Sequence, residues 1–346
     1  MAGGVLLAIS GATQLFSVTW AAAIPPDPRA AMTQRWLMAM GAVAAIVGVV
    51  RDSAVLVVVG SATLGLGLLT LGSILIWVAR RSLLKRFGLS SRFYLLGIGA
   101  GVVGVTLGGL VGAGGGGGRY LDIRVAHMHL NLVGMVGFTI VGTLPTILPT
   151  MVGHKMVSGR EAVFGFWVSA AALGAMAIGA LSGPVAVGVG CALAGVGAAV
   201  TLFGIGLRLG IDKMVTSGLP AALVLSGSLW LIGWMFVQSV TLMAGELVIW
   251  SRATAVGVGG VALVLFGSLA YLVPVLAGPG SNLTANFERM HGNGWVRLAL
   301  ANAAVAAVAV GLGGALVLPV AASFLADFAW RVGRVLLLGR PRPSAG

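Results

Sequence analysis

The chain has 346 residues, of which 58% are hydrophobic and only 8% are charged. A water-soluble domain of this length needs far more charged surface, and an outer-membrane barrel needs short alternating strands, so both classes are excluded. The net charge of +13 does not indicate nucleic-acid binding, because basic residues concentrate in the cytoplasmic loops of membrane proteins. The chain is therefore predicted to be an all-α, polytopic transmembrane helix bundle in the lipid bilayer.

Apolar runs long enough to form membrane helices follow one another along the whole chain, since one crossing takes about 20 apolar residues. We expect a single integral membrane domain over residues 1–346 with ten or eleven spans. The last two runs are separated only by Gly313-Gly314, and joining them gives the smaller number. In chain order, the predicted spans are 4–24, 36–50, 54–79, 94–117, 126–149, 163–182, 185–207, 219–243, 254–277, 296–312 and 315–330.

The distribution of basic residues between the loops predicts the orientation. With the N-terminus outside, seventeen of the 21 Lys and Arg residues fall on the inner side. By the positive-inside rule, this bias predicts an integral protein of the cell (inner) membrane with its N-terminus outside and its C-terminus in the cytoplasm. The inner group includes Arg289, Arg297 and Arg331, and the outer group is Arg51, Arg119, Arg124 and Arg252.

A His-x-His pair, His127 and His129, opens the fifth predicted span at the outer side of the membrane. Ionisable groups at the edge of a bilayer are costly to hold and are functional candidates. Neighbours two apart on an α-helix point about 200° apart. Either one imidazole therefore binds a centre inside the bundle while the other faces elsewhere, or an unwound segment lets both converge. In the alternative, both simply form hydrogen bonds to carbonyls or lipid headgroups.

The residues around the pair suggest two kinds of site. The helix face of His127 continues through Asn131 and Gly134, and its glycine offers space for a flat macrocycle. Imidazole suits both haem iron and copper. Met243 and Glu246 end the eighth span at the same depth as the histidines. The cofactor-binding candidates are His127, His129, Asn131 and Gly134, and the metal-binding candidates are His127, His129, Met243 and Glu246.

Residues 142–153 and 267–278 form a weak internal repeat. Both carry Gly, Leu, Pro and Gly at matching positions, and both end a predicted span four helices apart. Parallel repeats are one way to build large membrane folds, so the pattern favours four-helix parallel repeats. Proline near a helix end is also a simple stop signal, which leaves coincidence as the alternative.

The segment Ala126-His-Met-His-Leu-Asn-Leu-Val-Gly, followed by Leu148-Pro149, resembles the haem-bearing second helix of haem–copper oxidase subunit I. Val18-Thr19-Trp20 and residues 297–303 resemble segments of compact actinobacterial membrane domains of the copper-oxidase or nitrite-reductase-associated type. The resemblance implies that His129 or His127 is an axial haem b ligand. It also implies a multicopper oxidase, nitrite-reductase-like or cytochrome electron-transfer partner.

The later spans depart from that family, because they lack its further histidines. The repeat positions that match His127 and His129 are Arg252 and Thr254. We therefore expect no complete binuclear centre and no independent catalysis, but binding of haem b or copper for electron transfer, metal handling or sensing. One alternative is a transporter or permease whose path is lined by Gln14, Gln238 and Glu246. Another is a structural membrane partner of a copper or respiratory enzyme.

Overall fold

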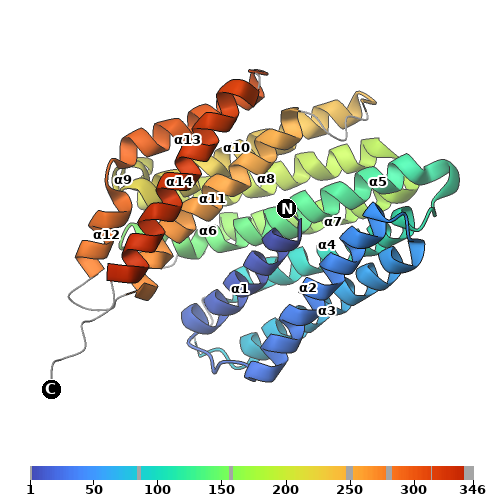
Figure 1. Ribbon diagram of the computed structural model, residues 1–346, viewed down its shortest axis with the longest axis horizontal. Helices are drawn as coiled ribbons and strands as arrows, with labels where there is room; N and C mark the ends of the chain where they lie inside the picture. Colours follow the sequence, from blue (N-terminus) through green and yellow to red (C-terminus); the bar gives the residue numbers. More distant parts are fainter. Residues whose placement is uncertain are drawn as a thin grey trace. The chain divides into compact units, whose positions relative to one another are not determined.

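The computed structural model describes residues 2–83, 87–155, 159–246, 252–277, 283–312 and 314–338. Within these ranges every regular element is a helix and no strand occurs, which confirms the all-α prediction (Figure 1). Gly313, at the predicted division of the last two spans, lies outside the described residues, as do Lys85 and Arg86 of the inner loops.

Each of the eleven predicted spans falls on helical structure, with 126–149 divided over α5, η3 and α6, and the boundaries differ by a few residues at most ends. Two short helices, α9 and α12, were not predicted. The α-helices are α1 (Ala2–Ala21), α2 (Pro28–Val50), α3 (Ala54–Arg80), α4 (Gly88–Gly112), α5 (Tyr120–His129), α6 (Phe138–Met151), α7 (Arg160–Ser182), α8 (Pro184–Leu209), α9 (Ile211–Thr216), α10 (Leu219–Met243), α11 (Arg252–Ala277), α12 (Leu283–His291), α13 (Gly294–Ala309) and α14 (Gly314–Leu338).

Eight of the described helical segments are long and apolar enough to cross a membrane, which supports a multi-pass membrane protein. They are α2, α3, α4, the continuous segment Gly117–Met151, α7, α8, α10 and α11. The apolar helices Leu6–Ala21 and Gly294–Ala309 are shorter.

The segment Gly117–Met151 changes its helical pitch in the middle. After the 3-10 turn η2 (Gly117–Arg119), α5 runs to His129 and passes directly into a π-helix, η3 (Leu130–Gly137), before α6 begins at Phe138. Such π segments are rare and often occur at functional sites. Hydropathy alone predicts a single span here, and the change of pitch directly after the histidine pair is a finding of the structure.

The chain divides into two compact units. Unit 1 contains residues 1–146, 156–205 and 235–249. Its N-terminal helices α2 and α3 lie side by side in Figure 1 and pack through glycines. A Cβ on Gly60 would lie 2.3 Å from the backbone nitrogen of Ala45, so only glycine permits this approach. In the same unit, α4 contacts α3, α5, α7 and η3.

Unit 2 contains residues 147–155, 206–234 and 250–346. In it α11 packs on α12, α13 and α14, and α14 also contacts α12 and α13. Phe266 on α11 makes an edge-to-face contact with Phe324 and a tilted contact with Phe328 on α14, at ring-centroid distances of 5.2 and 4.8 Å. Trp230 donates a hydrogen bond from Nε1 to Asn302 Oδ1 at 2.9 Å. Aromatic contacts thus join α11 to α14, and a hydrogen bond joins α10 to α13.

Candidate functional site

Both histidines of the pair belong to the regular helix α5, so the unwound alternative is not what the structure has. His129 is the last residue of α5, and the π-helix begins directly after it. Because they are two positions apart on a helix, the two rings point to different sides. Each ring is therefore described by its own surroundings.

His127 faces α4. Its Nδ1 lies 2.6 Å from the carbonyl oxygen of Gly104. Since a carbonyl only accepts, Nδ1 carries the ring proton and donates it. Asn131, one turn further on, donates from Nδ2 to the backbone carbonyl of His127 at 2.8 Å. His127 on α5 and Asn131 on η3 are therefore hydrogen-bonded to each other, and His127 is also bonded to α4.

This contact follows a row of glycines on α4, Gly97, Gly101, Gly104 and Gly108, here called the glycine seam. A Cβ on Gly108 would lie 2.4 Å from His127 Cε1, and one on Gly104 would lie 2.5 Å from Asn131 Nδ2. Further along, Gly101 and Gly97 meet Met135 and Thr139 in the same way. Small residues allow such close approach of membrane helices, so the seam seats the His127 ring against the α4 backbone.

Gly134 was predicted to leave space for a macrocycle beside His127. In the structure Ala100 of α4 fills that space, because a Cβ on Gly134 would lie 2.6 Å from the Cβ of Ala100. A haem does not fit between His127 and Gly134 in this arrangement. The predicted cofactor face of His127, Asn131 and Gly134 is a helix–helix contact here.

His129 lies in the interior of unit 1 and is only 2% exposed. Its Nδ1 donates to the carbonyl oxygen of Val125, one turn back on α5, at 2.9 Å. The proton is thereby held on Nδ1, and the lone pair of the neutral ring is on Nε2. Gln238 on α10 is 1% exposed, and its side chain interacts with this ring. The result is an imidazole–amide pair inside the bundle, the His129–Gln238 pair.

The two other predicted metal-binding residues lie at the end of α10. Met243 is 52% exposed and accepts a weak hydrogen bond at its sulfur from Ser239, at 3.6 Å. Glu246 follows the helix and is exposed. Among the described residues, no three His, Cys, Asp or Glu side chains come close enough together to hold a metal ion. The predicted set of His127, His129, Met243 and Glu246 is therefore not gathered into such a cluster.

Gln14, a candidate for lining a transport path, takes part in the contact between α1 and α2. Its Nε2 donates to Gln34 Oε1 at 2.9 Å, and the hydroxyl of Ser10 donates to the same oxygen at 2.8 Å. Polar groups on neighbouring membrane helices stabilise helix association in this way. Gln14 is thus part of a hydrogen-bond group of its own, whereas Gln238 interacts with His129.

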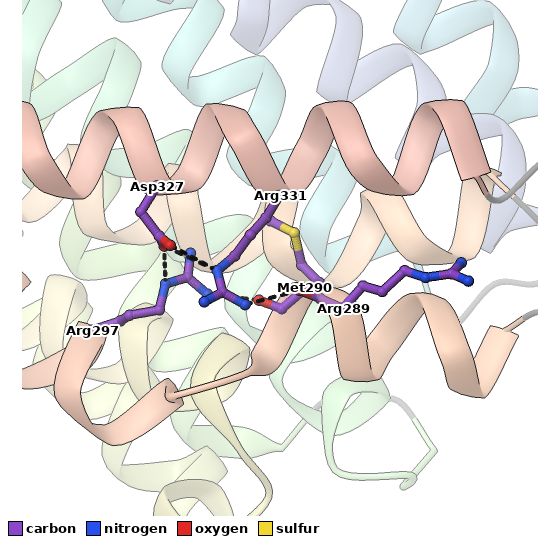
Figure 2. Close-up of polar contacts among 5 residues, drawn as sticks. All are labelled: Arg289, Met290, Arg297, Asp327 and Arg331. Atoms are coloured by element: carbon purple, nitrogen blue, oxygen red, sulfur yellow. Dashed lines mark hydrogen bonds and ion pairs between the residues drawn. The ribbon is translucent and has the colours of Figure 1, made fainter.

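Unit 2 contains a charged cluster that was not predicted from the sequence. Arg297, counted among the inner loop residues, lies in α13 and is 5% exposed. Its Nε lies 2.7 Å from Asp327 Oδ2 of α14 (Figure 2). The available signal was Asp327 itself, one of only eight acidic residues, inside the predicted span 315–330. An acidic residue in an apolar span predicts a basic partner.

The chain matches no family model, and neither a curated protein nor a solved structure matches it. The helical architecture and the apolar spans therefore define the class, an all-α multi-pass membrane protein. The resemblance to haem–copper oxidase subunit I stays a hypothesis.

Proposed function

We propose that the protein is a multi-pass membrane protein that binds haem b or copper through Nε2 of His129 and serves electron transfer, metal handling or sensing. The observation that supports this most directly is the orientation of the His129 ring. Metal-binding histidines usually donate their other ring N–H to a carbonyl or carboxylate, which fixes the tautomer and the ring plane. The bond from His129 Nδ1 to the Val125 carbonyl is such a contact.

The surroundings of His129 add two further supports. An imidazole in the interior of a membrane bundle is costly to keep, which favours a functional role. The Gln238 side chain interacts with the same ring, so its amide can orient the imidazole or a group bound to it. The π-helix directly after His129 is also a common feature of functional sites.

The two histidines have different roles in this proposal. Because α4 closes the face between His127 and Gly134, a cofactor belongs on the His129 side. When bound, haem or copper would supply one-electron redox chemistry. The protein would supply the Nε2 ligand, the tautomer fixed by Val125 and the apolar surroundings that exclude water. His127 would position α5 against α4 without touching the cofactor.

The test is optical and elemental analysis of the full-length protein purified in detergent. A Soret band or stoichiometric copper in the wild type, lost in His129→Ala and retained in His127→Ala, supports the proposal. Size-exclusion chromatography checks that both variants are folded. A wild-type protein without colour or metal, or a cofactor lost only in His127→Ala, overturns it. A metal-free protein that shows substrate-dependent flux in vesicles supports the transporter instead.

A further inference from the structure

The charged cluster of unit 2 contains more positive than negative charges. The carboxylate of Asp327 lies 2.7 Å from Arg297 Nε and 3.0 Å from Arg331 Nε, so two guanidinium groups share one carboxylate (Figure 2). Arg331 Nη1 also donates to the backbone carbonyl oxygen of Arg289 on α12 at 2.9 Å, while the Arg289 guanidinium points away from Asp327 (Figure 2). Glu288 of α12 is exposed to solvent. Since like charges crowded together repel, the cluster favours a further anion.

The second observation concerns hydrogen-bond donors. Arg297 donates from Nη1 to the carbonyl oxygen of Met290 at 2.6 Å, but its buried Nη2 has no acceptor among the described residues. The Nε of Arg297 is in ion-pair contact with Asp327 at 2.7 Å, so Nη2 is the nitrogen that has neither a charged nor a hydrogen-bonded partner among the described residues. A buried guanidinium with open N–H groups is costly, and such groups normally find a partner or a bound ion.

Asn286 on α12 also has a buried hydrogen-bond donor without an acceptor. It is fully buried, and its Oδ1 accepts from Arg289 Nη1 at 2.9 Å. Its Nδ2 is a buried donor with no acceptor among the described residues. The junction of α12, α13 and α14 therefore holds two buried side chains whose open groups are all donors. Donors without acceptors call for a ligand that only accepts, which is the chemistry of an anion.

The exposed tryptophans of α13 and α14 favour a phosphate group as the anion bound at this junction. Trp295 at the start of α13 and Trp330 within α14 are 61% and 67% exposed. Exposed tryptophans of membrane proteins are enriched at the level of the lipid headgroups. Basic pockets between membrane helices at that level bind phosphate-bearing headgroups, and guanidinium groups match phosphate oxygens well.

We propose that the junction of α12, α13 and α14 binds a phosphate group, with Arg297 as the principal donor and Arg331 as the neighbouring charge. The phosphate belongs either to the headgroup of an anionic lipid or to a soluble phosphate. The site lies in unit 2 and is independent of any cofactor at His129.

The test compares the full-length wild type with Arg297→Gln, Arg331→Gln and the control Arg334→Gln. Arg334 lies on the same helix and is exposed. In one arm, thermal unfolding in neutral detergent is followed with inorganic phosphate against chloride at equal ionic strength. In the other, the protein is reconstituted in nanodiscs of phosphatidylglycerol or phosphatidylcholine, and bound lipid is counted by native mass spectrometry.

Wild type and Arg334→Gln are expected to gain about 2 °C or more in unfolding midpoint from phosphate, or to retain phosphatidylglycerol, and the Arg297 and Arg331 variants to lose that response. A response to phosphate alone identifies a soluble ligand, and retention of lipid alone identifies a headgroup; either supports the site. No response in both arms overturns the proposal, and so does an equal response in all four proteins. Because Arg331→Gln leaves the buried Arg297 in place, it tests the site even if Arg297→Gln fails to fold.

Discussion

At the scale of single residues, the two histidines of α5 show how far a motif can be interpreted. The His-x-His spacing predicts that two rings on a helix diverge, and the structure agrees. The spacing does not say which residues surround each ring. Those residues lie on α4, whose Gly104 carbonyl holds His127, and on α10, whose Gln238 meets His129. Neither partner is near the motif in sequence.

His291, at the end of α12, gives a prediction at this scale. It lines a cavity of about 310 Å³ together with Tyr271 and Phe287, and its Nε2 lies 3.3 Å from the carbonyl oxygen of Ala270. Burial lowers the pKa of His291 below its usual 6.5, and the positive charge of Arg297 lowers it further, while the Ala270 carbonyl opposes them. The unfolded chain therefore binds a proton at a higher pH than the folded one.

We therefore expect the unfolding midpoint of the protein to fall as the pH drops below about 6.5, because protonation then favours the unfolded state. His291→Asn should weaken this dependence at low pH and leave the midpoint at pH 8 nearly unchanged. Thermal unfolding between pH 8 and pH 5 measures it. His154→Asn is the control, since His154 is exposed. Equal slopes in the wild type and His291→Asn contradict the expectation.

At the scale of elements, the length of an apolar run predicts where a helix lies, but not its pitch or the partners of its side chains. The run 126–149 correctly predicts a span, but hydropathy does not reveal the π-helix within it. The glycines of α4 are visible in the sequence, yet their partners His127, Asn131, Met135 and Thr139 are known only from the fold. Arg297 is the second residue of the predicted span 296–312 and was counted with the inner basic residues, whereas the structure pairs it with Asp327 on α14.

The glycine seam can be tested with two substitutions on the same helix. In Gly108→Ala the new Cβ would lie 2.4 Å from His127 Cε1, and that ring cannot withdraw without losing its bond to Gly104. Overpacking of this kind costs about 1–3 kcal/mol in the free energy of unfolding. Gly99→Ala meets no atom within 4 Å, so it should be neutral or stabilising by about 0.5–1 kcal/mol. Equal unfolding midpoints for the two variants in detergent would contradict the described contact.

At the scale of the whole molecule, the order of the apolar helices follows from hydropathy, but their orientation in the membrane rests on charge alone. The eleven predicted runs all became helices, and eight described segments meet the length and hydropathy of a membrane span. The four-helix repeat stays a prediction. The bias of basic residues towards one side predicts an external N-terminus, a property that the helices by themselves do not determine.

Site-directed labelling across α4 tests that orientation. Gly88, at the start of α4, and Gly118, in the turn η2, are exposed and have no atom within 4 Å of a new Cβ, so cysteines fit at both positions. The single native cysteine, Cys191, is fully buried and should not react, which makes the wild type the background control. With the N-terminus outside, a membrane-impermeant maleimide added to intact cells should label Gly118→Cys at once and Gly88→Cys only after permeabilisation. The reverse pattern would invert the predicted topology and move His127 and His129 to the cytoplasmic half of the membrane.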